Sequence, residues 1–398
     1  MTDSVATKWS KIQAMAIARA FSMLGTELTI FTLVFREKEQ GPAAVAALFI
    51  AGALPSIVFS PWAGTIADRF STRSVIPLFS LIGGIAIFSQ TQQLPTWLIL
   101  ILLFISSACG TVVAPTWGKL VRTLAAPEDF SRANGVIQSY FALAMLSGPF
   151  VAGYLVTTTG FVWTFLIDGF FTTLIAVMPF LLNVNFKPEK LQPGEKVKVT
   201  GGYAQLFKDK FLRALTIMVF AMVLCISVVN VGDVFLLTEQ LHANAFIYGL
   251  VGAGFALGSL LGGLLAGKLK LSAMTELTVL GAGLGVLSLS GLAVGLAPNY
   301  WFVLVVWFFA GMGNAAINSY GVGMMIRAIP MEVQGRTFAA FNGIISTAGI
   351  GSQAAAGVIL GFVDVRTLFV TAGVMAFTAF ATLFPVVFRT QREIITAA

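Results

Sequence analysis

Twelve apolar stretches dominate this sequence and restrict the folds open to it. Crossing about 30 Å of hydrocarbon takes roughly 20 residues of helix. The stretches come close to that length or exceed it, and they lie near residues 12–35, 43–67, 74–92, 95–118, 134–158, 161–184, 211–237, 245–267, 275–297, 300–326, 337–362 and 367–388. Only helices and closed barrels satisfy their backbone in lipid, and these stretches lack the alternation of barrel strands. We therefore predict an all-α membrane protein with twelve transmembrane helices.

The composition supports a membrane protein and argues against several other classes. Of 398 residues, 57% are hydrophobic and only 10% are charged, which is too little charge to cover a soluble domain of this size. Cys109 and Cys225 lie far apart in apolar stretches, and His242 is the single histidine. We therefore expect no disulfide framework, no metal site and no cofactor.

Lysine and arginine are distributed unevenly between the loops. With the N-terminus inside, most of the 24 basic residues fall in cytoplasmic segments. Only Arg36, Lys38 and Arg366 fall outside, and Arg19 lies within a helix. Basic residues mark the cytoplasmic side of multi-pass proteins. Both termini are therefore expected in the cytoplasm, and the net charge of +7 does not indicate a nucleic-acid partner.

One polar segment divides the chain into two halves. Residues 185–210 contain two prolines and six lysines without an apolar run. We predict a six-helix bundle over 1–184, a cytoplasmic linker over 185–210 and a second six-helix bundle over 211–398. The basic face of the linker would lie against anionic lipid head groups.

The two halves carry similar loops at matching places. The loop after the fourth stretch contains Arg122, Pro127-Glu128 and Arg132, and the loop after the tenth contains Arg327, Pro330, Glu332 and Arg336. Such a repeat predicts two halves related by an axis along the membrane normal, which alternate access by rocking.

Three motifs give the chain a resemblance to the major facilitator superfamily. The loop after the second stretch reads Gly64-Thr-Ile-Ala-Asp68-Arg69-Phe-Ser-Thr-Arg73 and is similar to the signature loop of that family. Gly148-Pro149-Phe-Val-Ala-Gly153 is similar in part to its antiporter motif, with Tyr154 in place of a second glycine. The loop with Pro127-Glu128, Arg132 and Asn134-Gly135 resembles the branch that contains macrolide-efflux proteins and siderophore exporters.

The resemblance implies a gate at Asp68. In the family the equivalent aspartate contacts the start of helix eleven, here near Arg336 or Thr337, when the cytoplasmic side is closed. A carboxylate can also accept hydrogen bonds from the free N–H groups at the start of a neighbouring helix. The alternative is a loop whose Arg69 and Arg73 only fix orientation.

Four charged residues lie clearly inside the predicted helices, away from their ends: Arg19, Glu27, Asp168 and Asp233. Charges at this depth usually face protein or a water-filled cavity. Burial favours the neutral form of a carboxyl group, so Glu27 could exchange a proton as its exposure alternates between the two sides. Glu27 is therefore the first candidate for proton coupling, with Asp233 and Arg19 as further candidates. Its alternative is a structural pairing, and Asp168 is expected to be structural.

The resemblance also implies which helices line the central cavity. Polar or soft residues near the middle of those helices are Met23, Gln138, Tyr140, Met145, Met222, Asn230, Asn314, Asn318, Asn342 and Gln353. Methionine and aromatic walls adapt to ligands of different shapes. For any single one of these residues, the alternative is packing alone.

The leading hypothesis is a proton-coupled antiporter, not an enzyme, that exports lipophilic or cationic small molecules of the multidrug or macrolide type. The alternatives are an exporter of a siderophore or other metabolite, a lipid-like substrate transporter, and a non-transporting receptor or scaffold. The glycines of Gly254-x-x-x-Gly258-x-x-x-Gly262 are expected to serve close helix packing rather than nucleotide binding. We expect a monomer in the bacterial cytoplasmic membrane.

Overall fold

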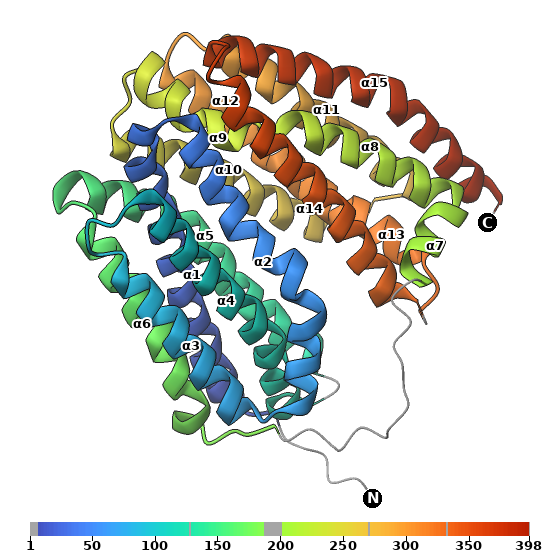
Figure 1. The fold of residues 1–398 in the computed structure, drawn as a ribbon. Coiled ribbons are helices and arrows are strands. Elements are labelled where there is room, and N and C mark those ends of the chain that lie inside the picture. Colours follow the sequence, from blue (N-terminus) through green and yellow to red (C-terminus); the bar gives the residue numbers. More distant parts are fainter. Residues whose placement is uncertain (1–6, 127–128, 187–200, 270, 332, 398) are drawn as a thin grey trace, which may run out of the picture. The chain divides into compact units, whose positions relative to one another are not determined.

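The computed structural model describes residues 7–126, 129–186, 201–269, 271–331 and 333–397, and within these ranges all regular structure is helical. The all-α prediction is confirmed. The elements before the expected linker are α1 (Trp9–Glu37), η1 (Lys38–Gln40), α2 (Pro42–Arg69), α3 (Thr72–Ser89), α4 (Thr96–Leu124), α5 (Phe130–Thr158) and α6 (Val162–Leu181) (Figure 1). Those after it are α7 (Gly201–Lys208), α8 (Lys210–Ile226), α9 (Val229–Phe235), η3 (Leu236–Gln240), α10 (Ala245–Lys268), α11 (Ala273–Gly295), α12 (Tyr300–Ala316), η4 (Ile317–Gly321), α13 (Val322–Ala328), α14 (Gln334–Ile359) and α15 (Val365–Ala397).

Eleven helical stretches among the described residues are long and apolar enough to cross a membrane. They correspond to eleven of the twelve expected spans, with α8, α9 and η3 joined in Lys210–Gln240 and α12, η4 and α13 joined in Tyr300–Ala328. The expected span 337–362 falls on α14. That helix has 26 residues, enough length to cross, but it is rich in glycine, alanine and small polar residues. The twelfth span stays a prediction.

The chain forms two compact units, one of residues 1–39 and 47–195 and the other of residues 40–46 and 196–398. In the first unit α1 packs against α5 and α6, and α3 packs against α4 and α6 (Figure 1). A core of large apolar side chains, including Ile12, Trp117 and Leu120, joins these helices.

One end of the first unit is held by polar contacts. Arg36 donates hydrogen bonds to the carbonyl groups of Gln90, Gln92 and Leu94, at 2.9 to 3.3 Å. Thr96 donates a hydrogen bond of 2.6 Å to Glu37, which is buried. These contacts tie the end of α1 to the turn between α3 and α4.

In the second unit α10 packs against α12, α11 packs against α15, and α14 packs against α7 and α8. Four of its helices begin at a side chain that caps the first turn by accepting a backbone N–H: Asp209, Asn244, Ser272 and Asn299. Capping satisfies N–H groups that the helix itself leaves free.

Part of the expected linker is helical. Residues 201–208 form α7, which packs against α8 and α14. Residues 187–200 lie outside the described part of the chain. The division into bundles 1–184 and 211–398 stays a prediction in its detailed boundaries.

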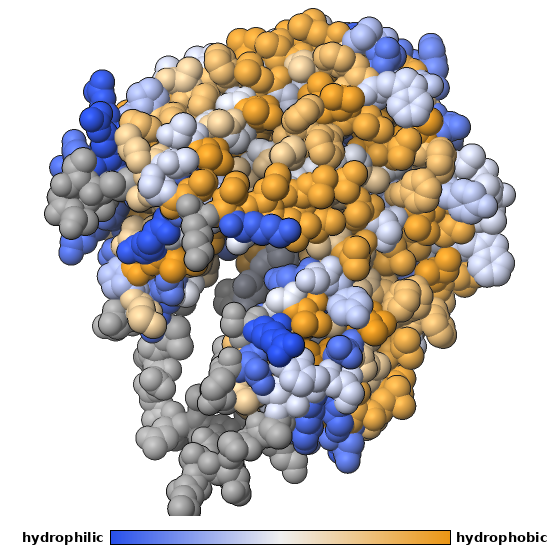
Figure 2. Space-filling view, turned by 180° about the vertical axis from the view of Figure 1, so that it is seen from behind, coloured by the Kyte–Doolittle hydropathy of each residue, from blue (hydrophilic) through white to orange (hydrophobic). Residues whose placement is uncertain are grey.

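Large apolar side chains are exposed along the helices, as expected for a surface that faces lipid. Trp97 is 62% exposed, Ile85 64% and Leu181 68%. Figure 2 shows broad apolar areas on the visible face, with hydrophilic side chains in smaller groups between and beside them. Such apolar exposure is rare on soluble proteins.

Glycines allow α10 and α12 to approach closely. A Cβ atom added at Gly258 would lie 1.9 Å from the carbonyl oxygen of Phe308, and one added at Gly311 would lie 2.1 Å from that of Phe255. Close approach at small residues is the main packing device of helices in lipid. The expected packing role of Gly254, Gly258 and Gly262 is confirmed.

We predict that Gly258→Ala destabilises the second unit by about 1–3 kcal/mol, since the new methyl group must push the two helices apart. The matched control is Gly263→Ala in the same helix, where an added Cβ meets nothing within 4 Å. Thermal unfolding of the purified protein in detergent would measure both. Equal melting temperatures for the two variants would contradict this account of the α10–α12 contact.

Candidate functional site

Glu27 lies on α1 against the glycine of the Gly148-Pro149 motif on α5. A Cβ atom added at Gly148 would lie 2.5 Å from Cβ and 2.8 Å from Cγ of Glu27. Gly148 is buried and Glu27 is half-buried. The absence of a side chain at Gly148 therefore makes the space in which the stem of Glu27 lies. The carboxyl group of the first span and the Gly-Pro motif of the fifth, which lie far apart in sequence, therefore meet at one contact.

A groove of about 210 Å³ runs between α1 and α5 on the same unit. Phe21, Leu24, Tyr140 and Leu143 line it, together with Ser147. Its wall is therefore mainly apolar, with one phenol and one hydroxyl group. Tyr140, a cavity candidate from the sequence, lies in this groove.

Arg19 is half-buried on α1, eight residues before Glu27. The ion pairs found among the described residues join Arg36 to Glu37, Lys119 to Asp68, and Arg327 to Glu276. Neither Arg19 nor Glu27 takes part in one of these pairs. Among the residues that the structure describes, Glu27 thus forms no ion pair with a basic side chain, and gain or loss of a proton can change its charge.

Asp233 lies on α9 in the second unit and is half-buried. It accepts a hydrogen bond of 3.4 Å from the indole N–H of Trp307 on α12. Tyr248 on α10 lies close enough to interact electrostatically with the carboxylate. Three helices thus converge on this carboxyl group.

The second unit holds a cavity of about 260 Å³. It brings together four of the sequence candidates, Met222, Asn314, Asn318 and Asn342. Asn318 donates hydrogen bonds to the backbone and side-chain oxygens of Asn314, at 2.9 and 3.3 Å. The rest of the lining is mainly leucine, valine, isoleucine, methionine and phenylalanine. The cavity combines an uncharged apolar wall with a few amide groups, a common composition for small-molecule sites.

A π-helical segment shapes this cavity. η4 (Ile317–Gly321) interrupts the helix between α12 and α13, and Ile317, Asn318 and Gly321 all line the cavity. Such π-helical turns are frequent at functional sites. Sequence spacing alone predicts an uninterrupted α-helix here.

The other cavity candidates are not gathered in these spaces. Met23 is half-buried, while Gln138, Met145 and Asn230 are exposed. The side-chain oxygen of Gln353 is buried without a hydrogen-bond partner among the described residues. Their contact with a substrate stays a prediction.

The Asp68 loop has its own set of contacts within the first unit. Lys119, at the end of α4, forms an ion pair with Asp68. Arg73 donates a hydrogen bond of 2.6 Å to Asn183 beyond the end of α6. The sequence did not predict Lys119 as a partner of Asp68, which lies in the last turn of α2; Lys119 reaches it from α4, 51 residues away in sequence.

The remaining gating candidates are exposed or loosely packed. Arg69 and Arg336 are exposed, and a Cβ added at Gly64 meets nothing within 4 Å. Asp68 belongs to the first unit, whereas Arg336 and Thr337 belong to the second. The predicted contact between them stays a prediction.

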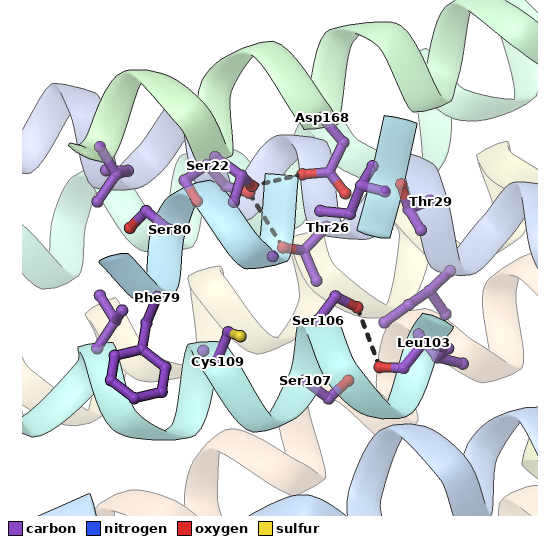
Figure 3. A pocket seen from close by; sticks show the side chains of 17 residues that line it. Ser22, Thr26, Thr29, Phe79, Ser80, Leu103, Ser106, Ser107, Cys109 and Asp168 are labelled. Carbon is purple, nitrogen blue, oxygen red and sulfur yellow. Dashed lines mark hydrogen bonds between the residues drawn. The ribbon is translucent and has the colours of Figure 1, made fainter. Parts of the chain in front are cut away.

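A polar cavity around Asp168 was not anticipated. The sequence suggested a structural residue, yet the structure places Asp168 on the wall of a cavity of about 190 Å³ between α1, α3, α4 and α6 (Figure 3). The signal that could have identified it is the hydroxyl content of four mainly apolar helices: Ser22 and Thr26 on α1, Ser80 on α3, Ser106 and Ser107 on α4, and Thr172 on α6. Among the described residues no three His, Cys, Asp or Glu side chains gather as metal ligands.

Comparison with known proteins identifies the family. The family model described as Major Facilitator Superfamily matches residues 15–238 and 226–396. The chain belongs to the major facilitator superfamily. It is a multi-pass membrane transporter and not an enzyme.

Curated relatives of this superfamily member include drug-efflux proteins. Macrolide efflux protein A of Enterococcus faecalis is 24% identical over 319 residues, which cover 78% of this chain and 98% of that protein. Multi-drug resistance efflux pump PmrA of Streptococcus pneumoniae is 25% identical over 230 residues, 54% of each chain. The crystal structure of nucleoside transporter NupG matches with a TM-score of 0.76 at 13% identity, covering 95% of this chain and 98% of that one, and shows the same fold.

We predict that Gly148→Ala in this transporter lowers its transport rate at least tenfold, because the added methyl group displaces Glu27 by steric overlap. The matched control is Gly135→Ala in the same helix, where an added Cβ meets nothing within 4 Å. Transport by both purified variants in proteoliposomes would measure the effect. Equal rates, at equal protein incorporation, would contradict a functional role for the Gly148–Glu27 contact.

Proposed function

We propose that this protein is a proton-coupled antiporter that exports lipophilic or cationic small molecules, of the macrolide or multidrug type, across the bacterial cytoplasmic membrane. The observation that carries the proposal is Glu27 packed against Gly148 in the bundle of α1 and α5. A half-buried carboxyl group without a basic partner can bind a proton on one side of the membrane and release it on the other.

The substrate class is supported by two independent features. The cavity lined by Met222, Asn314 and Asn342 is apolar with a few amide groups, which suits a lipophilic molecule with some hydrogen-bonding groups. Curated relatives at 24% and 25% identity are named as macrolide and multidrug efflux proteins. A cationic molecule would compete with the proton for Glu27, and this competition would couple the two movements.

The topology proposed with this function has twelve spans and both termini in the cytoplasm. The twelfth span is α14, whose 26 residues would extend about 39 Å. A helix with many glycine and small polar residues is suited to a cavity wall rather than to lipid. The two units would act as one monomer that rocks between inward-open and outward-open states.

The coupling role of Glu27 has a direct test. Glu27→Gln keeps the size of the side chain and removes its titration, so transport driven by an imposed pH gradient should fall at least tenfold while downhill exchange of substrate persists. The matched control is Glu39→Gln, an exposed glutamate outside the helix bundle. The assay uses purified protein in proteoliposomes with a panel containing a macrolide, a lipophilic cation and a siderophore.

The outcomes of this assay separate the candidate functions. Gradient-driven movement of the siderophore alone would favour the metabolite exporter. No movement of any compound by the parent protein would favour a receptor or scaffold. If transport by Glu27→Gln depended on pH as it does in the parent, this result would contradict a coupling role for Glu27.

The proposed gate at Asp68 leads to a second prediction. Asp68→Asn weakens the ion pair with Lys119 and the proposed contact with the start of α14, so the population of the inward-open state should rise. Distances between spin labels on the cytoplasmic ends of the helices would report the shift, with Asp364→Asn on an exposed loop as control. Distance distributions identical to those of the parent would rule out a gate at this residue.

A further inference from the structure

The cavity around Asp168 lies within the first unit, apart from the residues assigned to coupling and to the substrate. Asp168 projects from α6, and its side chain is 1% exposed. The hydroxyl residues of the lining are Ser22, Thr26 and Thr29 from α1, Ser80 from α3, Ser106 and Ser107 from α4, and Thr172 from α6. Figure 3 shows the α4 side chains on the wall opposite Asp168.

The geometry of the helices holds Asp168 at this position. A Cβ atom added at Gly25 would lie 2.5 Å from Oδ1 and 2.7 Å from Cα of Asp168. α1 and α6 therefore touch backbone to backbone at the level of the carboxylate. The carboxylate cannot move toward α1 and is directed along the cavity.

The hydrogen bonds around the carboxylate are incomplete. Thr172 donates to Oδ1 at 3.1 Å. Thr29 is 3% exposed, and its hydroxyl faces the carboxylate, yet it makes no well-formed hydrogen bond with any described group. Buried hydroxyl groups normally have a partner. A hydroxyl oxygen that lies beside a carboxylate without a well-formed hydrogen bond can act as a ligand for a cation.

The charged residues in and around the cavity determine which kind of cation it can bind. Asp168 is the one charged residue among those that line the cavity, within the part of the chain that the structure describes. On the neighbouring helices, Arg19 and Glu27 of α1 lie outside the lining, Arg73 of α3 is bonded to Asn183, and Lys119 of α4 is paired with Asp68. Cys109, also on α4, lines the cavity with an uncharged thiol. A buried carboxylate without a basic partner is neutralised either by a proton or by a bound cation.

We propose that this cavity is a binding site for a monovalent metal cation, Na⁺, with Asp168 as its charged ligand and Thr29 and Thr172 as hydroxyl ligands. One carboxylate balances one positive charge, whereas a divalent ion would leave an excess charge in a low-dielectric bundle. The remaining ligands are neutral oxygens, which suit a hard cation rather than a soft transition metal. A volume of about 190 Å³ holds the ion and several waters.

This site does not depend on the proposed export function, because binding can be measured without transport. Binding of radioactive ²²Na⁺ to the purified full-length protein in nanodiscs, at fixed pH and with choline keeping the ionic strength constant, tests it directly. We expect saturable binding to the parent protein, and a rise in melting temperature with Na⁺ but not with choline. Asp168→Asn should weaken binding at least tenfold.

Two further variants keep the test decisive. Asp364→Asn makes the same change at an exposed aspartate of the other unit and should bind Na⁺ as the parent does. Thr29→Val removes one hydroxyl ligand with little change of shape and should weaken binding severalfold, which decides the matter if Asp168→Asn does not fold.

Three results would overturn the proposal. They are the absence of saturable Na⁺ binding to the folded parent, equal binding by the parent and both cavity variants, and stabilisation by acid alone with no response to Na⁺. The last would make Asp168 a proton site. Failure of the Na⁺ test would leave the export assays unaffected, and the reverse holds as well.

Discussion

Both candidate sites of the first unit depend on glycines, which allow two helices to pack with little distance between their backbones. At Gly148, α5 leaves room for the stem of Glu27, and at Gly25, α1 comes within reach of the backbone of Asp168. Lipid supplies no hydrophobic drive between helices, so dispersion contacts at small residues hold the bundle together. The same contacts determine where the few buried carboxylates lie. The glycines that allow helix packing in this unit therefore also position its buried carboxylates.

Each unit has an ion pair near the loop between its second and third long helices. In the first unit Asp68 at the end of α2 pairs with Lys119 at the end of α4, and in the second Glu276 at the start of α11 pairs with Arg327 at the end of α13. Ion pairs of exposed groups contribute little to stability. Such weak ion pairs can form and break with a small change in free energy. This is compatible with helix ends that change partners during a transport cycle.

Much of the fold follows from the sequence because membrane helices are specified by length and hydropathy. Eleven expected spans are present, and the glycine spacing of α10 predicts close helix packing, which the structure shows against α12. The candidate sites depend on rotations and contacts between helices, which a single sequence does not specify. The meeting of Glu27 with Gly148 and the cavity at Asp168 both lie beyond what spacing along one helix can predict. The Lys119 partner of Asp68 belongs to the same group, since its helix is far away in sequence.

The π-helical segment η4 also sets the register of the helix that contains it. A π-helical turn closes its hydrogen bonds over one more residue than an α-helical turn, so η4 amounts to a one-residue insertion. Without that residue, everything from Val322 onward would turn by about 100° about the helix axis. Arg327 would then face away from Glu276, and Met324 and Met325 would leave the core of the unit. The extra residue thus lets one span direct the amide groups of Asn314 and Asn318 toward a cavity and the charge of Arg327 toward a neighbouring helix.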